Sequence, residues 1–217
     1  MLTTTEYDHH LPIGSLPKAL MERGVDWKKD ASARFFYADR GRSDQLRSKL
    51  CRNQTLLCGI TWKSFRADLG LRKSLDLTQL KPLFDIPNIR LVNLQYGDVR
   101  HETDAFEAAL GRKPFFDTKI DNYHDLDGHS ALIDACDLLI MSCNASAHLA
   151  GAMGKNVFLL APRSQSRIWY WSNLNDRRSA WYPSIEIFYQ SLDGSWTAAI
   201  RSIEERLRQH INHLPSR

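Results

Sequence analysis

Short apolar runs alternate along the chain with segments whose apolar residues recur at helical spacing. From residue 55 onward the apolar runs contain β-branched residues and end at glycine or polar residues, which is typical of buried strands. We expect strands at 55–62, 89–97, 137–143, 157–162 and 184–190. We expect helices at 77–86, 102–111, 127–136, 145–153 and near 195–213. This order predicts an α/β fold: a single Rossmann-like domain with a mostly parallel sheet and helices on both faces.

The first 54 residues have a different pattern. The stretch "LPIGSLPKAL" carries two prolines and a Gly-Ser pair, and the residues after it mix charges with one short aromatic run. We expect a loop with one helix near 43–51 and no core of its own. The sequence therefore predicts an N-terminal arm and connecting segment at 1–54, followed by the Rossmann-like domain at 55–217.

The composition excludes several classes of protein. With 217 residues, 43% hydrophobic and 25% charged, the chain is long enough for one sizeable core and has the make-up of a globular protein. The net charge of +4 is modest and the basic residues are scattered, which argues against nucleic-acid binding. No apolar segment approaches the ~20 residues that span a bilayer, and the first residues lack the features of a secretory signal. The four cysteines form no C-x-x-C pair, so we expect free thiols, a cytoplasmic protein and no metal site.

The segment "CNASAHLAGAMG" at 143–154 joins two apolar runs and consists almost wholly of small residues. Asn144 is placed to cap a helix, which is expected to leave the amides of Ala145, Ser146 and Ala147 at the positive end of the helix dipole, where phosphates bind. The Ser146 hydroxyl adds a donor, and the dipole is expected to keep His148 neutral. The alternative is a tightly packed core helix with a structural cap and a satisfied histidine.

The end of the first expected strand adds a cation near this helix. In "GITWKSFR", Trp62 and Lys63 follow the strand, and the carboxyl ends of parallel strands share one edge of a sheet. Lys63 is suited to neutralise a diphosphate as a mobile point charge, although a lysine here is as often a solvated loop residue. Arg66, Arg72 and Lys73 raise the local positive charge, and each taken singly is expected at the surface.

Other polar and aromatic residues have structural explanations. Asp127, in "DLDG", is expected to cap the following helix, and a ribose contact is the less frequent alternative. One long segment contains four aromatic residues: Trp169, Trp171, Trp181 and Tyr182. Most of them are expected to pack this loop against the rest of the protein, and one could line a pocket for a base or sugar ring. The sequence has no nucleophile–base pair, carboxylate pair or metal-ligand spacing, so it assigns no catalytic residue, metal or cofactor.

Five blocks, in order, resemble the C-terminal half of a GT-B glycosyltransferase. They are "GITWKS", "KSLDLTQLKPLF", "LVNLQYG", the run from "DLDGHSALIDAC" to "AHLAGAMGKNVFLL", and "SAWYPSIEIFYQ" with its following "GSW". They span about residues 55–210. The likeness is to heptosyltransferase-like and O-GlcNAc-transferase-like domains of the kind that follow tetratricopeptide repeats in bacterial proteins.

This resemblance implies a nucleotide-diphosphate sugar as donor substrate, bound by the domain at 55–217 without a metal. The residues that it implies for the diphosphate are Lys63, Asn144, Ala145 and Ser146. The residues that it implies for the ribose, sugar or base are Trp62, Asp127 and His148.

The chain also departs from the family pattern. Ala145 replaces a hydroxyl residue, and Tyr170 and Tyr189 stand where relatives have arginine. Only about fifty residues precede the domain, whereas a GT-B enzyme needs two halves. The chain is then a fragment of a longer protein, a stand-alone half that pairs with another chain or a second copy, or a degenerate relative. The leading hypothesis is a donor-binding half that transfers a sugar when an acceptor half, with its general base, is available. The alternative is a non-catalytic interaction module on a degenerate scaffold. An NAD-dependent dehydrogenase is disfavoured because G-x-G-x-x-G is missing.

Overall fold

The computed structural model describes residues 10–25, 34–51, 55–65, 70–163, 171, 177–179 and 181–212. Arg66, Trp169 and Tyr170, which the sequence analysis singled out, lie outside these residues.

The chain divides into two units, Met1–Ala31 and Ser32–Arg217. The described residues of the first unit form a 3-10 helix, η1 (Ile13–Ser15), and a helix, α1 (Leu16–Glu22). Helix α1 was not expected from the sequence, and it buries none of its residues. The first unit therefore contributes no core among its described residues.

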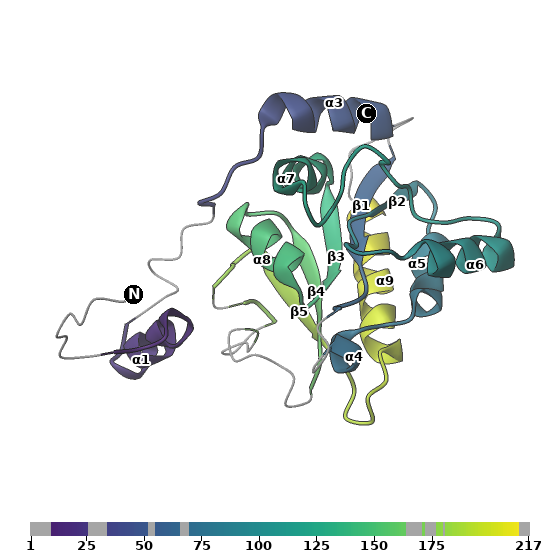
Figure 1. Ribbon diagram of the computed structural model, residues 1–217. Helices are drawn as coiled ribbons and strands as arrows, with labels where there is room; N and C mark the ends of the chain where they lie inside the picture. The colour runs from purple at the N-terminus through teal and green to yellow at the C-terminus, as the bar shows by residue number, and fades with distance from the viewer. Residues whose placement is uncertain are drawn as a thin grey trace. The chain divides into compact units, whose positions relative to one another are not determined.

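The second unit contains a five-stranded parallel sheet with helices around it (Figure 1). Its strands are β1 (Leu56–Thr61), β2 (Ile89–Asn93), β3 (Leu138–Ser142), β4 (Val157–Ala161) and β5 (Ile185–Tyr189). Its helices are α3 (Arg40–Leu50), α4 (Gly70–Lys73), η2 (Leu77–Leu80), α5 (Lys81–Phe84), α6 (Arg100–Leu110), α7 (Leu126–Ala135), α8 (Ala145–Ala152) and α9 (Thr197–Asn212). The expected strands and helices are all present with slightly shifted ends, and the helix expected at 77–86 is the pair η2 and α5. The expected α/β fold class is confirmed.

The strands are hydrogen-bonded in the order β2-β1-β3-β4-β5, and all neighbours are parallel. The chain runs outward from β1 to β2, returns to β3 on the other side of β1, and continues to β4 and β5. The direction of winding therefore reverses between β1 and β3. In open parallel sheets, ligands bind beyond the carboxyl ends of the strands at such a reversal. A ligand site is therefore expected at the residues that follow β1 and β3.

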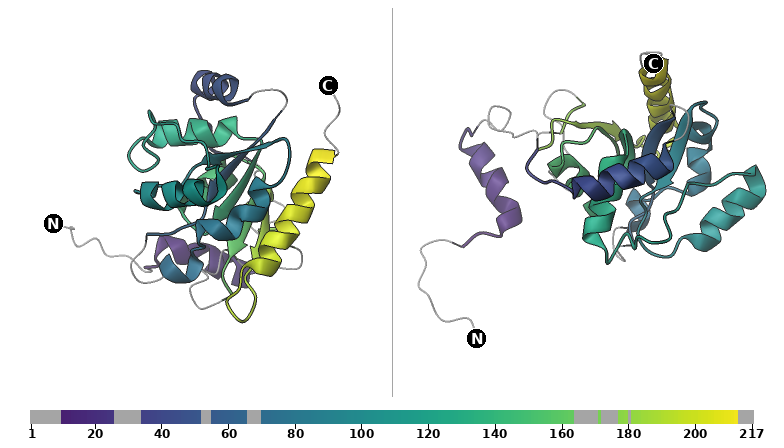
Figure 2. Two further views of the ribbon diagram at one scale, coloured as in Figure 1. Left: turned by 90° about the vertical axis from the view of Figure 1, so that its right-hand side faces the viewer. Right: turned by 90° about the horizontal axis from the view of Figure 1, so that it is seen from above.

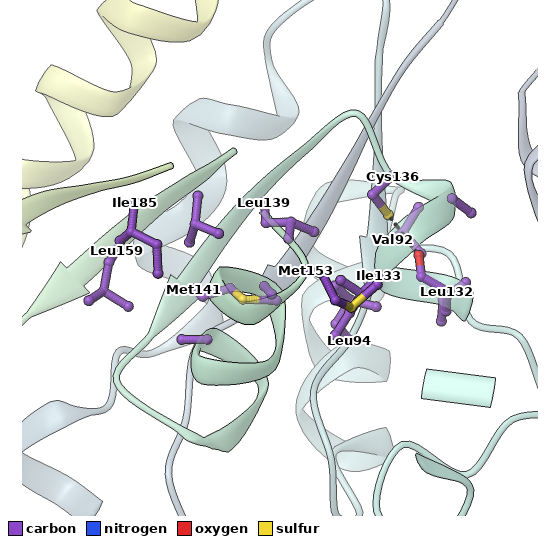
Figure 3. Packing of buried hydrophobic residues seen from close by; sticks show 14 of the residues in the cluster. Val92, Leu94, Leu132, Ile133, Cys136, Leu139, Met141, Met153, Leu159 and Ile185 are labelled. Carbon is purple, nitrogen blue, oxygen red and sulfur yellow. Dashed lines mark hydrogen bonds between the residues drawn. The ribbon is translucent and has the colours of Figure 1, made fainter. Parts of the chain in front are cut away.

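Helices cover both faces of the sheet, with α7 on one side and α9 on the other (Figure 2). One buried cluster joins α3, α7 and α8 to one face of the sheet, and Figure 3 shows part of it, including Leu139 and Met141. The other joins α5, α6 and α9 to the opposite face, which carries Leu138 and Ile140. Successive residues of β3 alternate between the faces and all are buried, which explains the continuous apolar runs of the sequence.

Helix α3 changes the expected domain boundary. Leu46 and Leu50 belong to the buried cluster that α7 and α8 share, and Leu50 has no exposed surface. Arg47 pairs with Asp137, at the start of β3, across 2.7 Å. The compact unit that contains the sheet begins at residue 32, so the boundary expected between residues 54 and 55 falls inside it.

Close packing explains the small residues of α8. Ala147 and Ala150 are fully buried. A Cβ atom added at Gly151 would lie 2.5 Å from Cγ of Tyr182, so no larger residue fits without a shift. Gly154 has a φ of 68° and follows the last turn of the helix, as expected for a C-terminal stop. The composition of this helix is therefore accounted for by packing and does not by itself indicate a ligand.

Candidate functional site

Asn144 fastens the ends of β1 and β3. As expected, it caps α8, because its Oδ1 accepts a hydrogen bond from the amide of Ala147 at 3.2 Å. Its Nδ2 donates to Oγ1 of Thr61 at 3.1 Å and to Oγ of Ser142 at 3.3 Å, which ties both strand ends to the helix. Both polar ends of the Asn144 side chain are thus occupied within the protein.

The first turn of α8 keeps two of the three backbone donors expected there, because the amide of Ala147 is bound to Asn144. None of the described residues accepts a hydrogen bond from the amides of Ala145 and Ser146. Ala145 is exposed, and both amides lie at the positive end of the dipole of this eight-residue helix. A phosphate oxygen is a suitable acceptor for both.

The Ser146 side chain has a partner that the sequence did not reveal. Its Oγ lies 2.9 Å from Nε2 of His129, and Nδ1 of His129 lies 3.0 Å from Oδ1 of Asn122. His129 is 3% exposed, and burial lowers the pKa of its imidazole to about 4. The hydroxyl that was expected to serve a diphosphate is therefore bound to a neutral histidine of α7.

Lys63 is neutralised within the protein. Its ammonium group pairs with Oε2 of Glu102, on α6. The same carboxylate accepts hydrogen bonds from the indole Nε1 of Trp62 at 3.1 Å and from the amide of Leu77 at 3.1 Å. Trp62 has no exposed surface, so the expected contact between Trp62 and a ligand is wrong for this structure: the ring belongs to the core. Lys63 is still partly exposed, but Glu102 neutralises its charge on the face of the sheet that α6 covers.

Lys73 is the cation that the sequence analysis misplaced. It was expected at the surface, yet it is only 4% exposed at the end of α4. No acceptor among the described residues pairs with its ammonium group. Its charge contributes to lowering the pKa of His148, so it lies within electrostatic reach of the first turns of α8. Burying an ammonium group without a counter-charge is costly, and an anionic ligand at this edge would offset that cost.

The sequence around Lys73 gives no periodic signal for its burial. Lys73 ends α4, Leu77 begins η2, and the three residues between them lie in no helix or strand, so no regular pattern relates Lys73 to the buried Leu75 and Leu77.

His148 is neutral, as expected, but the main cause differs. Its pKa falls to about 4 because the ring is largely buried, with a smaller effect from Lys73. Its Nδ1 lies 3.2 Å from the hydroxyl of Tyr182, and its ring contacts that of Trp171 in a tilted arrangement with centroids 4.4 Å apart. Trp171 is 1% exposed, so it packs the loop down, as expected for most aromatic residues of this segment. Trp181 is half-buried.

The cap of α7 is Asp125, not Asp127. Oδ1 of Asp125 accepts a hydrogen bond from the amide of Gly128 at 2.8 Å, and its carboxylate also binds the guanidinium of Arg42 at 2.6 Å. The helix begins at Leu126, one residue earlier than the sequence predicted, which moves the capping role to the preceding aspartate. Asp127 is exposed in the first turn.

Among the described residues, no three His, Cys, Asp or Glu side chains gather as metal ligands, and no helix has both the length and the apolar character needed to cross a membrane. All four cysteines are free, as expected. Burial raises the pKa of Cys58 and brings that of Cys136 to about 12, so both thiols stay protonated and unreactive near neutral pH.

Comparison with known proteins gives likenesses in sequence and in structure. In sequence, the chain is similar to the protein FlbA of Caulobacter vibrioides, with 32% identity over 151 residues that make up 69% of this chain and 24% of FlbA. In structure, it is similar to the E. coli ADP-heptose LPS heptosyltransferase II, with a TM-score of 0.51 and 14% identity, over 82% of this chain and 52% of that one. A weaker likeness, with a TM-score of 0.49 and 8% identity, is to E. coli heptosyltransferase WaaC with ADP, over 77% of this chain and 48% of that one. No protein-family model matches the chain.

The chain thus has the fold of a GT-B glycosyltransferase domain, as the resemblance in its sequence implied. It spans about a quarter of FlbA and about half of heptosyltransferase II. At 14% identity, the likeness to heptosyltransferase II defines the fold and not the reaction.

Proposed function

We propose that this chain is the donor-binding half of a glycosyltransferase and binds a nucleotide-diphosphate sugar beyond the carboxyl ends of β1 and β3. The diphosphate would accept hydrogen bonds from the amides of Ala145 and Ser146, and the ammonium group of Lys73 would neutralise part of its charge. The observation that carries the proposal is the burial of Lys73 without an anionic partner among the described residues. Lys63 is a second candidate cation: its ammonium group would have to leave Glu102 and pair with the diphosphate instead.

The same arrangement suits the chemistry of sugar transfer. The bond between the anomeric carbon and the diphosphate oxygen breaks while the acceptor oxygen bonds to that carbon, so negative charge builds on the leaving diphosphate. Amides and an ammonium group held beside it stabilise that charge. The acceptor oxygen gives its proton to a base, which we assign to an acceptor half outside this chain. That half is another chain, a second copy, or a further region of a longer protein.

Contacts with the rest of the donor are part of the same proposal. His148 is a neutral, half-buried imidazole near Lys73, which suits a hydroxyl of the ribose or sugar. Asp127 is exposed at the start of α7 and is kept as a candidate contact for the ribose, sugar or base. Four free cysteines suit a reducing compartment, and we place the protein in the cytoplasm on that ground.

A non-catalytic interaction module is the second candidate. It is favoured by the internal partners of Asn144, Ser146 and Lys63, which leave fewer side-chain donors for a ligand than the sequence predicted. It is also favoured by the exposure of two aromatic side chains beyond the sheet edge, Phe65 (51%) and Tyr123 (68%), which suit contact with a protein partner.

Calorimetric titration with UDP, GDP and ADP separates the two candidates. For the diphosphate that binds most tightly, Lys73→Ala should weaken binding about tenfold or more, because a charge-assisted hydrogen bond is lost. Arg72→Ala is the matched control, since Arg72 is the exposed neighbour on the same helix, and it should change the affinity by about twofold or less. Absence of binding by the unmodified chain, or binding that Lys73→Ala leaves unchanged, would favour the interaction module.

A further inference from the structure

A chain of three side chains, from Asn122 through His129 to Ser146, has a direction that its hydrogen bonds define. Nδ2 of Asn122 donates to the carbonyl oxygens of Asn93 at 3.3 Å and Gln95 at 3.2 Å. Oδ1 of Asn122 therefore faces Nδ1 of His129, 3.0 Å away. Because an amide oxygen only accepts, Nδ1 of His129 must carry a proton.

The other ring nitrogen of His129 is then the acceptor. His129 is almost completely buried, and its lowered pKa keeps the ring neutral near neutral pH, so Nε2 carries no proton. Nε2 lies 2.9 Å from Oγ of Ser146, so the Ser146 hydroxyl donates to it. The single hydroxyl proton of Ser146 is thus committed to the interior of the protein.

The hydroxyl oxygen of Ser146 can still accept a hydrogen bond. The hydroxyl oxygen has two lone pairs, and no other side chain or amide of the described residues donates to it. Ser146 is 5% exposed in the first turn of α8, next to the exposed Ala145. A phosphate oxygen carries no proton to donate to this atom, so both oxygens would be acceptors and their lone pairs would repel each other. A hydroxyl group has a proton to donate.

We propose that His129 makes Ser146 a hydrogen-bond acceptor for a hydroxyl group of the ribose or sugar of the bound nucleotide-sugar, and not a ligand of the diphosphate. This inference rests on the proposed function and deepens it. The diphosphate then depends on the backbone amides and Lys73, whereas Ser146 selects for a hydroxyl-bearing group beside it. His129 is a positioning residue, because it acts only through Ser146.

The direction of the hydrogen bonds can be tested without any ligand. Nitrogen-15 NMR of the histidine rings in the unmodified protein, near neutral pH, reports which ring nitrogen carries the proton. We expect His129 to be the neutral tautomer protonated at Nδ1. A neutral tautomer protonated at Nε2, or a charged ring, would overturn the inference whether or not the protein binds nucleotides.

The consequence for binding is tested with three probes: inorganic pyrophosphate, the nucleoside diphosphate that binds most tightly, and the same nucleotide carrying a sugar. Ser146→Ala should weaken the nucleotide-sugar about fivefold, the effect of one neutral hydrogen bond, and leave pyrophosphate unchanged. A loss already present with the nucleoside diphosphate assigns the hydroxyl to the ribose, and a loss confined to the nucleotide-sugar assigns it to the sugar. His129→Leu should likewise weaken nucleotide-sugar binding and leave pyrophosphate binding unchanged. His129→Gln keeps an acceptor on the side chain and should therefore restore nucleotide-sugar binding.

Ser130→Ala is the matched control. Ser130 is 1% exposed on α7, and its hydroxyl donates to the carbonyl oxygen of Leu126 at 2.7 Å, so its removal tests the general effect of losing a buried hydroxyl. Pyrophosphate binding that falls as much as nucleotide-sugar binding in Ser146→Ala, or nucleotide-sugar binding that does not fall, contradicts the inference. Failure of the unmodified protein to bind any probe is a different result: it removes the proposed function, and the inference with it.

Discussion

Acidification should destabilise this protein within a pH range set by two histidines, of which His129 is buried and His148 is half-buried. His129 and His148 each have a pKa of about 4 in the folded protein, because burial disfavours their charged forms, against an ordinary value of 6.5. Between these two values the unfolded chain binds protons that the folded chain does not. The free energy of unfolding therefore falls as the pH is lowered through 6.5, and this loss levels off below about pH 4.

The size of the effect follows from the two pKa shifts. A shift from 6.5 to about 4 is equivalent to roughly 3 kcal/mol per histidine at its full extent. At about pH 5 the contribution of each histidine to the free energy of unfolding is roughly 2 kcal/mol lower than at pH 7.5, so the pair together lowers it by about 4 kcal/mol. Asp121 and Asp125 do not interfere, because hydrogen bonds from His124 and Arg42 hold their pKa values below the usual 3.8 and move their contributions to lower pH.

Urea unfolding followed by tryptophan fluorescence, at several pH values from about 7.5 to 5, measures this dependence. His129→Gln and His148→Gln should each remove about half of the slope, whatever their effect on stability at the highest pH. His101→Gln, at an exposed position of α6, should leave the slope unchanged. An unfolding free energy that is constant over this range, or a slope that survives in both variants, would refute the assignment of two neutral imidazoles with lowered pKa values.

Three further predictions concern the fold around the site. Leu50→Ala should cost about 2–5 kcal/mol of unfolding free energy in urea, because Leu50 is fully buried in the core; a loss under about 1 kcal/mol would show that α3 is not part of the compact unit. Gly151→Ala should cost about 1–3 kcal/mol in the same assay, because its Cβ would meet the ring of Tyr182 at 2.5 Å; an unchanged midpoint would contradict this close packing. Asp125→Ala should cost about 1 kcal/mol and Asp127→Ala less than about 0.5 kcal/mol, and equal losses on thermal unfolding would contradict the assigned cap.

The sheet could be predicted from the sequence because its strands are buried on both faces. Runs such as "LLIM" in β3 have no polar position, which is the pattern of a strand covered on both faces. Helix α3 was assigned to a separate arm because its sequence is mostly polar. Its contribution to the core rests on a few residues, Leu46 and Leu50 among them, and these are too few to stand out in a charged segment.

The candidate site was less predictable, because it depends on pairings between residues far apart in the chain. Lys63 follows β1, as expected, but local sequence does not reveal that Glu102 of α6 takes its charge. The bond between His129 and Ser146 likewise needs α7 and α8 to lie side by side. Local sequence likewise does not separate the buried Lys73 from its exposed neighbour Arg72.

A crystal structure of the chain with a bound nucleoside diphosphate tests the central claim most directly. The measured quantities are the distances from the diphosphate oxygens to the amide nitrogens of Ala145 and Ser146 and to Nζ of Lys73. The account predicts hydrogen-bond distances of about 3 Å to at least one of these amides and to Lys73. A diphosphate bound away from the first turn of α8, with Lys73 still lacking an anionic partner, would contradict it.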